Sequence, residues 1–180
     1  MTTASGTTLS VSAIGADRPG IVAGVTGVLV AHGCNLEDTS MTILRGHFAM
    51  TMVVSSPVPA ATLATAIAPV AEQLELVVDV RDLAPVPAHS STGRPYVVSV
   101  HGADHPGIVH AVADLLARHG VNIADLTTHL VGDDEPLYVM TLDVEVPADV
   151  AAQGLAAALT QEADRLGVTA TLHAAETDLL

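Results

Sequence analysis

Apolar residues recur along this chain at two spacings, one typical of helices and the other of strands. Positions three or four residues apart line one face of a helix, whereas strict alternation marks a strand with one buried face. Helical spacing occurs at Ile21, Val25 and Leu29, and again at Ile108, Val112 and Leu116. Alternation occurs at Phe48, Met50, Met52 and Val54, and again at Tyr138, Met140, Leu142 and Val144. The pattern therefore predicts the same mixture of helix and strand twice.

The predicted elements follow the order strand, helix, strand, strand, helix, strand in each half. The first helices begin after Pro19 and Pro106, where a missing N–H is tolerated, and end at Gly33 and Gly120, which suit a C-terminal cap. The remaining strands and helices are expected at 9–14, 60–74 and 76–81, and at 96–101, 149–166 and 168–173. Pro69 is expected to kink or shorten the helix that contains it. The predicted fold class is α+β, as two tandem βαββαβ units.

The two halves also repeat each other residue by residue. A shift of 87 residues aligns 11–44 with 98–131, and 15 of those 34 positions are identical. The longest shared phrase is GADRPGIV at 15–22 and GADHPGIV at 102–109. A phrase repeated in the same place of the same pattern predicts one local structure used twice.

The unit boundaries follow from composition. The stretch 83–95 is rich in Pro and Ser and has no periodicity, which is typical of a linker. A three-residue insertion in the second copy falls in the acidic turn 132–136, where a change of loop length leaves the fold intact. We expect one unit over 7–82 and a second over 96–176.

Charge and composition exclude several classes of function. The 180 residues include six Arg, no Lys and 20 acidic residues, for a formal net charge of −14. Because nucleic-acid affinity depends on cations that neutralise phosphates, direct binding to DNA or RNA is not expected. No stretch reaches the roughly 20 apolar residues that span a bilayer, and the N-terminus lacks the pattern of a secretory signal. The single cysteine, Cys34, fits a reducing compartment, so we expect a cytoplasmic protein without membrane contact.

The sequence also lacks the motifs of catalytic sites. It contains no G-x-S-x-G, no P-loop lysine and no G-x-G-x-x-G after a strand. We therefore expect no enzymatic activity and no cofactor.

The repeated turn carries groups that suit a zwitterion. A strand-to-helix turn presents free backbone N–H groups at the positive end of the helix dipole, and a glycine there lets a carboxylate approach. The aspartate of the phrase can accept hydrogen bonds from an ammonium, and the asparagine after the helix offers a donor and an acceptor. The candidate ligand-binding residues are Asp17, Gly20, Ile21 and Asn35 in the first copy, and Asp104, Gly107, Ile108 and Asn122 in the second.

A purely structural interpretation competes with ligand binding. Aspartate before Pro-Gly can cap the helix, and asparagine after glycine can make a tight turn. Under that interpretation neither copy binds a ligand.

Three histidines distinguish the second copy. His101, His105 and His110 replace Ile14, Arg18 and Ala23 in the aligned sequence. Imidazoles can bind a divalent metal, but these lack the spacing of known zinc motifs, so the prediction is that no metal binds. The alternative is a polar rim that titrates near neutral pH.

Glycines distinguish the first helix of the first copy. Gly24 and Gly27 lie inside it, where each costs about 1 kcal/mol relative to alanine. We expect this smooth face to pack closely against another helix, between the units or between chains.

The phrase G-x-D-x-P-G-I-V, followed after a helix by H-G-x-N-[L/I], resembles the ACT domain. Both copies carry it, at 15–22 with 32–36 and at 102–109 with 119–123. The resemblance covers nearly the whole chain, and it implies ferredoxin-like regulatory units that sense amino acids. A chain of two such units is similar to regulators of amino-acid (glycine) metabolism. The implied partners are a small amino acid as effector, a transcription regulator as protein partner, and further copies of the chain in a homo-oligomer.

Two other functions fit the same sequence. One is a protein-interaction module whose units have lost their ligands, and the other is a detached regulatory subunit of an amino-acid pathway enzyme. Partner capture that ignores amino acids favours the first, and altered kinetics of a co-purifying enzyme favours the second.

Overall fold

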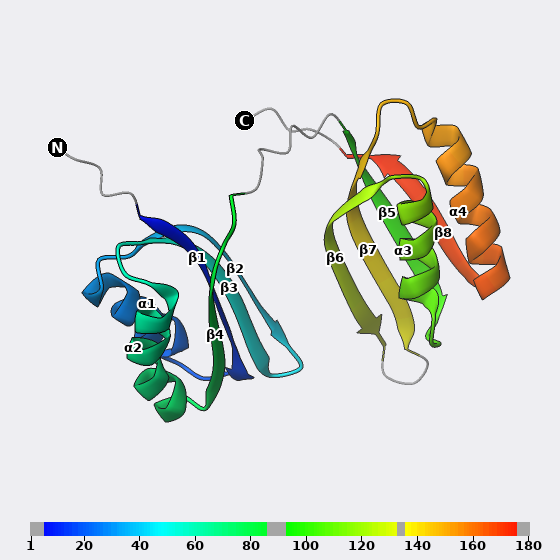
Figure 1. Cartoon of the computed structure of the whole chain (residues 1–180). Coiled ribbons are helices and arrows are strands. Elements are labelled where there is room, and N and C mark those ends of the chain that lie inside the picture. The colour runs from blue at the N-terminus through cyan, green and yellow to red at the C-terminus, as the bar shows by residue number, and fades with distance from the viewer. Residues whose placement is uncertain (1–5, 86–92, 133–135, 176–180) are drawn as a thin grey trace. The chain divides into compact units, whose positions relative to one another are not determined.

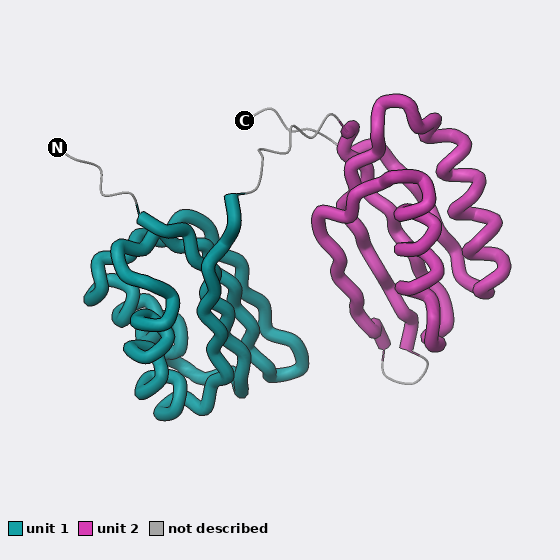
Figure 2. Tube along the Cα trace, viewed as in Figure 1, with its two compact units in different colours: residues 1–88 teal, residues 89–180 magenta. Residues whose placement is uncertain are grey.

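The structure is a computed structural model of the chain, and it describes residues 6–85, 93–132 and 136–175. The inserted residues 133–135 and much of the expected linker lie outside the described residues. The chain divides into two compact units, residues 1–88 and residues 89–180, which Figure 2 colours separately.

The first unit is an antiparallel sheet covered on one face by two helices (Figure 1). The strand order across the sheet is β2-β3-β1-β4, so the first and third strands of the chain lie in the middle. The elements are β1 (Thr7–Ala16), α1 (Ile21–Ala31), β2 (Asn35–Leu44), β3 (His47–Ser56), α2 (Ala60–Gln73) and β4 (Leu76–Asp82). Unit 1 thus has the predicted βαββαβ order.

The second unit repeats this arrangement with the sheet order β6-β7-β5-β8. Its elements are β5 (Arg94–Ala103), α3 (Ile108–Arg118), β6 (Asn122–Val131), β7 (Leu137–Val146), α4 (Ala152–Leu166) and β8 (Val168–Ala174). The expected tandem ferredoxin-like fold is confirmed in both units.

Alternation along the central strands builds the two cores. In β3, Phe48, Met50, Met52 and Val54 are all at most 4% exposed, because they face the helices. In β7 the matching residues are Tyr138, Met140, Leu142 and Val144, all at most 8% exposed. Among the described residues, the other face of each sheet carries no helix (Figure 1).

Pro69 does not end the helix that contains it. Helix α2 continues from Ala60 to Gln73, with buried residues on both sides of the proline at Leu63, Ile67 and Ala71. Burial of that face outweighs the one backbone hydrogen bond that proline removes. The expectation that Pro69 would shorten the helix was therefore wrong, and the alternative of a kink stays a prediction.

Only one of the two glycines inside α1 makes a close helix contact. A Cβ on Gly24 would lie 3.0 Å from Val70 Cγ1 and 3.1 Å from Leu74 Cδ1, so α1 packs tightly on α2 of the same unit. A Cβ on Gly27 would meet nothing within 4 Å. The close contact of Gly24 thus lies inside unit 1, so the expected partner for this face, a helix of the other unit or of another chain, was wrong for Gly24.

The helices are short. Helix α4, the longest within the described ranges, has 15 residues. None of the helices in these ranges is long and apolar enough to cross a lipid bilayer.

Candidate functional site

The repeated phrase forms the turn between the first strand and the first helix of each unit. Gly20 and Gly107 precede the helices with φ of 96° and 103°, a left-handed backbone that glycine adopts without a Cβ clash. The first helical hydrogen bonds run from the Gly24 N–H to the Gly20 carbonyl at 2.8 Å and from the Ala111 N–H to the Gly107 carbonyl at 3.0 Å. The helical N–H groups that precede Gly24 and Ala111 therefore have no carbonyl acceptor within their helix.

The aspartates do not cap these helices. Among the described residues no side-chain cap hydrogen bond is made at the start of α1 or α3, and both Asp17 and Asp104 are exposed. The Asp17 N–H instead donates to the Gly46 carbonyl at 2.9 Å, which ties the turn to the β2–β3 hairpin. The capping interpretation of the aspartates was therefore wrong, and both carboxylates remain free for other contacts.

The isoleucines of the phrase position the helices. Ile21 and Ile108 are 2% exposed and belong to the two cores. Their side chains are buried in the cores, which leaves their backbone N–H groups as the candidate binding groups.

The first glycine of each phrase is required for close strand packing. A Cβ on Gly15 would lie 2.8 Å from the Glu75 carbonyl oxygen, and one on Gly102 would lie 2.8 Å from Val168 Cγ1. Both distances are shorter than van der Waals contact. Glycine therefore lets the start of the turn lie against the last strand of its own unit.

Beside the turn of unit 2 lies a hollow of about 590 Å³. It is lined by the turn residues 104–107, the start of α3 at 108–110, Thr128 of β6 and Tyr138 of β7. The hollow thus brings three of the candidate residues together with two side chains from the sheet.

Asp104 sets the electrostatics of this hollow. Burial raises the pKa of the Tyr138 phenol above its ordinary value of 10.0, and the nearby Asp104 carboxylate raises it further. Asp104 is therefore close enough to interact with Tyr138 and exposed enough to meet a cation. An ammonium beside Asp104 and a carboxylate at the free N–H groups of α3 would complement the hollow.

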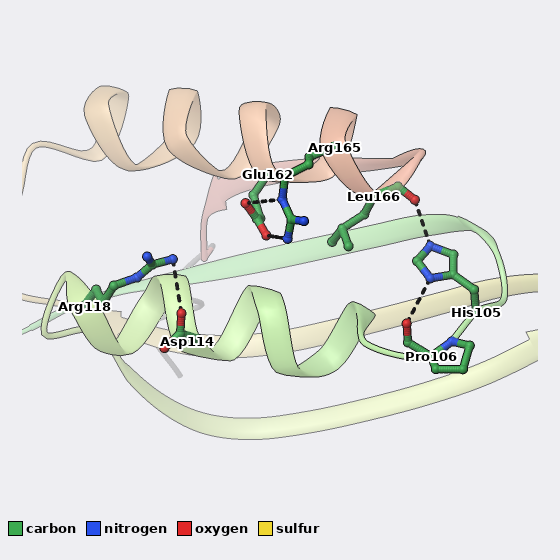
Figure 3. Close-up of polar contacts among 7 residues, drawn as sticks. All are labelled: His105, Pro106, Asp114, Arg118, Glu162, Arg165 and Leu166. Carbon is green, nitrogen blue, oxygen red and sulfur yellow. Dashed lines mark hydrogen bonds and ion pairs between the residues drawn. The ribbon is translucent and has the colours of Figure 1, made fainter.

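The residue that differs between the two phrases anchors the turn in both units. Arg18 Nη1 lies 3.2 Å from Glu75 Oε1 in unit 1. In unit 2, His105 Nε2 lies 2.8 Å from the Leu166 carbonyl oxygen, and Nδ1 lies 3.1 Å from that of Pro106 (Figure 3). Both side chains reach the end of the second helix of their unit. Arg18 and His105 therefore hold the same turn in place through different contacts.

The asparagines lie away from the turn. Asn122 begins β6 beyond the far end of α3, and an 11-residue helix spans about 16 Å at 1.5 Å per residue. Asn122 does not line the hollow beside Asp104. The same separation holds for Asn35 and Asp17 across α1, so the single compact site expected within one unit is not formed by these pairs.

The three histidines of unit 2 are dispersed. His101 follows the buried Val100 and therefore lies on the helix-free face of the sheet, whereas His105 and His110 lie at the hollow. The ring nitrogens of His105 already face carbonyl oxygens. Within the described parts of the chain, no three His, Cys, Asp or Glu residues lie where they could share a metal ion. A joint site of these histidines is therefore ruled out by their positions.

The histidines that end the first helices have a structural role. His32 Nδ1 lies 2.9 Å from the Val28 carbonyl oxygen, and His119 Nδ1 lies 2.8 Å from the Leu115 carbonyl oxygen. Each ring therefore bonds to a carbonyl of the last helical turn.

Unit 1 has a hollow of about 380 Å³ on the helix-free face of its sheet. Its lining includes Ser12, Ile14, Ser40 and Thr42 and contains no charged side chain. It therefore does not offer the pair of opposite charges that a zwitterion requires.

Comparison with known proteins places the chain in a family. The ACT domain family matches residues 7–81 and 94–173, which is most of the sequence. The chain belongs to the ACT domain family. The predicted resemblance is thereby confirmed, and each unit is one ACT unit.

Three relatives illustrate the range of similarity. The glycine cleavage system transcriptional repressor of Escherichia coli is 32% identical over 129 residues, which are 71% of this chain and 67% of the repressor. A UPF0237 protein of Methanopyrus kandleri is 61% identical over 44 residues, 24% of this chain, so the match spans about half (49%) of that relative. The crystal structure of a protein from Galdieria sulphuraria is 29% identical, with a TM-score of 0.77, over 94% of this chain and 98% of that one.

Two residues of the hollow were missed from the sequence. Thr128 carried no signal, because an alternating strand contains many such residues. Tyr138 did carry one, since it aligns with Phe48 and is the only aromatic exchange between the copies of β3 and β7. The contact itself depends on strand register, which places Tyr138 opposite Gly102.

Proposed function

We propose that this ACT protein is a non-catalytic regulator that binds a small amino acid at the turn before α3 and acts through a protein partner. The observation that carries the proposal is the hollow of unit 2, where the exposed Asp104 carboxylate lies beside the free N–H groups at the start of α3. A zwitterion fills both needs at once, since its ammonium pairs with the carboxylate and its carboxylate with the N–H groups.

A transcription regulator is the partner that the relatives favour. The E. coli relative is named a transcriptional repressor, and the net charge of −14 argues against direct contact of this chain with DNA. The chain would then act on transcription by binding a protein that contacts DNA. The ACT family and the name of the E. coli relative support a cytoplasmic regulator of amino-acid metabolism.

Calorimetric titration with the common amino acids tests the ligand. We expect one or a few of them to bind wild-type protein, and Asp104→Asn to abolish that binding because the ammonium loses its counter-charge. Asp143→Asn is a matched control, since Asp143 is an exposed carboxylate of β7 on the helix-free face of the same unit. Loss of binding in both variants, or no binding to wild type, would rule out this site.

A ligand-free interaction module is the second candidate. It is favoured by exposed apolar side chains in unit 1, where Val30 is 74%, Val77 71% and Leu44 61% exposed. This function predicts that the chain captures its partner equally well with and without amino acids, whereas the proposed sensor predicts capture that changes with the ligand.

A further inference from the structure

Tyr138 occupies the same place in unit 2 as Phe48 in unit 1. In the sheets, Tyr138 lies opposite Gly102 and Phe48 lies opposite Gly15, so the two rings share a register position beneath the turn. Both rings are nearly buried, at 8% and 2% exposure. The phenolic hydroxyl is therefore a polar group that unit 2 adds to an otherwise shared frame.

This hydroxyl lacks a strong protein partner. Its hydrogen bond within the described residues goes to Met140 Sδ at 3.7 Å, and a thioether sulfur is a weak acceptor. Tyr138 also lines the hollow beside Asp104. A nearly buried tyrosine that lines a hollow and donates to sulfur would gain a stronger bond from an oxygen acceptor that enters the hollow and reaches its hydroxyl.

The phenol of Tyr138 stays protonated. Burial and then the Asp104 carboxylate raise the pKa of Tyr138, so the group is a neutral donor throughout the physiological range. It therefore offers a hydrogen bond that the charged ends of a zwitterion, directed to Asp104 and to the N–H groups of α3, leave unused.

We propose that Tyr138 determines ligand specificity in unit 2 by donating a hydrogen bond to the side chain of the bound amino acid. The preferred ligands are small amino acids whose side chain carries a hydroxyl or an amide, because these provide the acceptor. The inference rests on the proposed function. Phe48, at the matching position of unit 1, has no hydroxyl and cannot make this bond.

Tyrosine fluorescence can serve as a probe of this site. It contains two tyrosines and no tryptophan, so Tyr96→Phe leaves Tyr138 as the sole tyrosine. Tyr96 lies in β5 outside the lining of the hollow, and phenylalanine keeps its ring. Tyrosine fluorescence of this variant then reports directly on the hollow.

The test titrates Tyr96→Phe with L-serine and L-asparagine and with their apolar counterparts L-alanine and L-leucine. We expect the polar members to change the fluorescence and to bind about tenfold more tightly, as for one hydrogen bond of ordinary strength. Calorimetry on Tyr138→Phe should show equal affinities for both members of each pair. Phenylalanine preserves the ring volume, and an unchanged melting temperature confirms that the variant is folded.

The outcomes separate the inference from the proposed function. A polar preference that survives in Tyr138→Phe, or that wild type does not show, overturns the inference while amino-acid binding stands. No binding of any amino acid to wild type overturns both.

Ultraviolet titration of the phenol in Tyr96→Phe gives an independent readout without ligand. Tyr138 should ionise above its ordinary pKa of 10.0, and Asp104→Asn should lower that pKa by removing the neighbouring negative charge. If Asp104→Asn leaves the pKa of Tyr138 unchanged, the hydroxyl does not face the proposed site and the inference is overturned.

Discussion

The turns before α1 and α3 share a backbone but are anchored by different chemistry. In unit 1 an exposed ion pair joins Arg18 to Glu75, and in unit 2 the His105 ring bonds to the Leu166 carbonyl. The acceptors differ for a local reason. Glu75 and Gly167 occupy the same left-handed position before the last strand, with φ of 55° and 69°.

The anchor therefore changes together with its acceptor. Glu75 offers a carboxylate, which suits the long guanidinium of Arg18. Gly167 has no side chain, so the nearest acceptor is the backbone carbonyl before it, which the shorter imidazole reaches. The one-letter difference in the shared phrase therefore preserves the position of the turn. By itself it creates no new site.

The largest expected effect concerns what the turns share. Gly15→Ala should destabilise unit 1 by about 2 kcal/mol, because its Cβ would lie 2.8 Å from the Glu75 carbonyl and the backbone would have to move. Gly102→Ala should destabilise unit 2 by a similar amount, since its Cβ would lie 2.8 Å from Val168 Cγ1 and 3.0 Å from the Val168 Cα. Urea unfolding of both variants measures the two costs.

Gly27→Ala is the control for this pair. Its Cβ would meet nothing within 4 Å in the middle of α1, so alanine should stabilise unit 1 by up to about 1 kcal/mol through helix propensity alone. Equal stability of Gly15→Ala and wild type would show that the turn does not lie as closely against β4 as the structure places it.

The sequence predicted the features of the two units that depend on residues close together in the chain. Alternation, helical spacing and the glycines after the first helices fixed the βαββαβ order in both units. The prediction of the site was wrong where segments far apart in the chain meet. The grouping of Asp104 with Asn122 overlooked that a helix holds its two ends about 16 Å apart. The contact of Tyr138 with the turn depends on pairing with Gly102 across β5 and β7, which no local pattern shows.

The next effect isolates the anchor of unit 2. His105→Ala should destabilise that unit by about 1 kcal/mol, because it removes the hydrogen bond to the Leu166 carbonyl at 2.8 Å. The loss should be the same at low and high salt, since the acceptor is an uncharged carbonyl. Thermal unfolding at two salt concentrations measures it, and a strong salt dependence would contradict the assignment of this anchor.

The smallest effect isolates the anchor of unit 1. Arg18→Ala should cost about 0.5 kcal/mol or less, because the Glu75 carboxylate is 73% exposed and surface ion pairs of this kind are screened by water. What distinguishes Arg18→Ala from His105→Ala is its response to salt, since added ions screen the pair further and the cost should approach zero near 1 M.

Glu75→Gln provides the matched variant, because it removes the charge from the other partner and keeps the side-chain length. If Arg18→Ala and Glu75→Gln destabilise unit 1 equally at low salt and the double variant costs no more than either, the ion pair alone anchors the turn. Additive losses that persist in 1 M salt would mean that Arg18 stabilises the turn through packing of its aliphatic part, and the contrast between an ionic and a neutral anchor would be wrong.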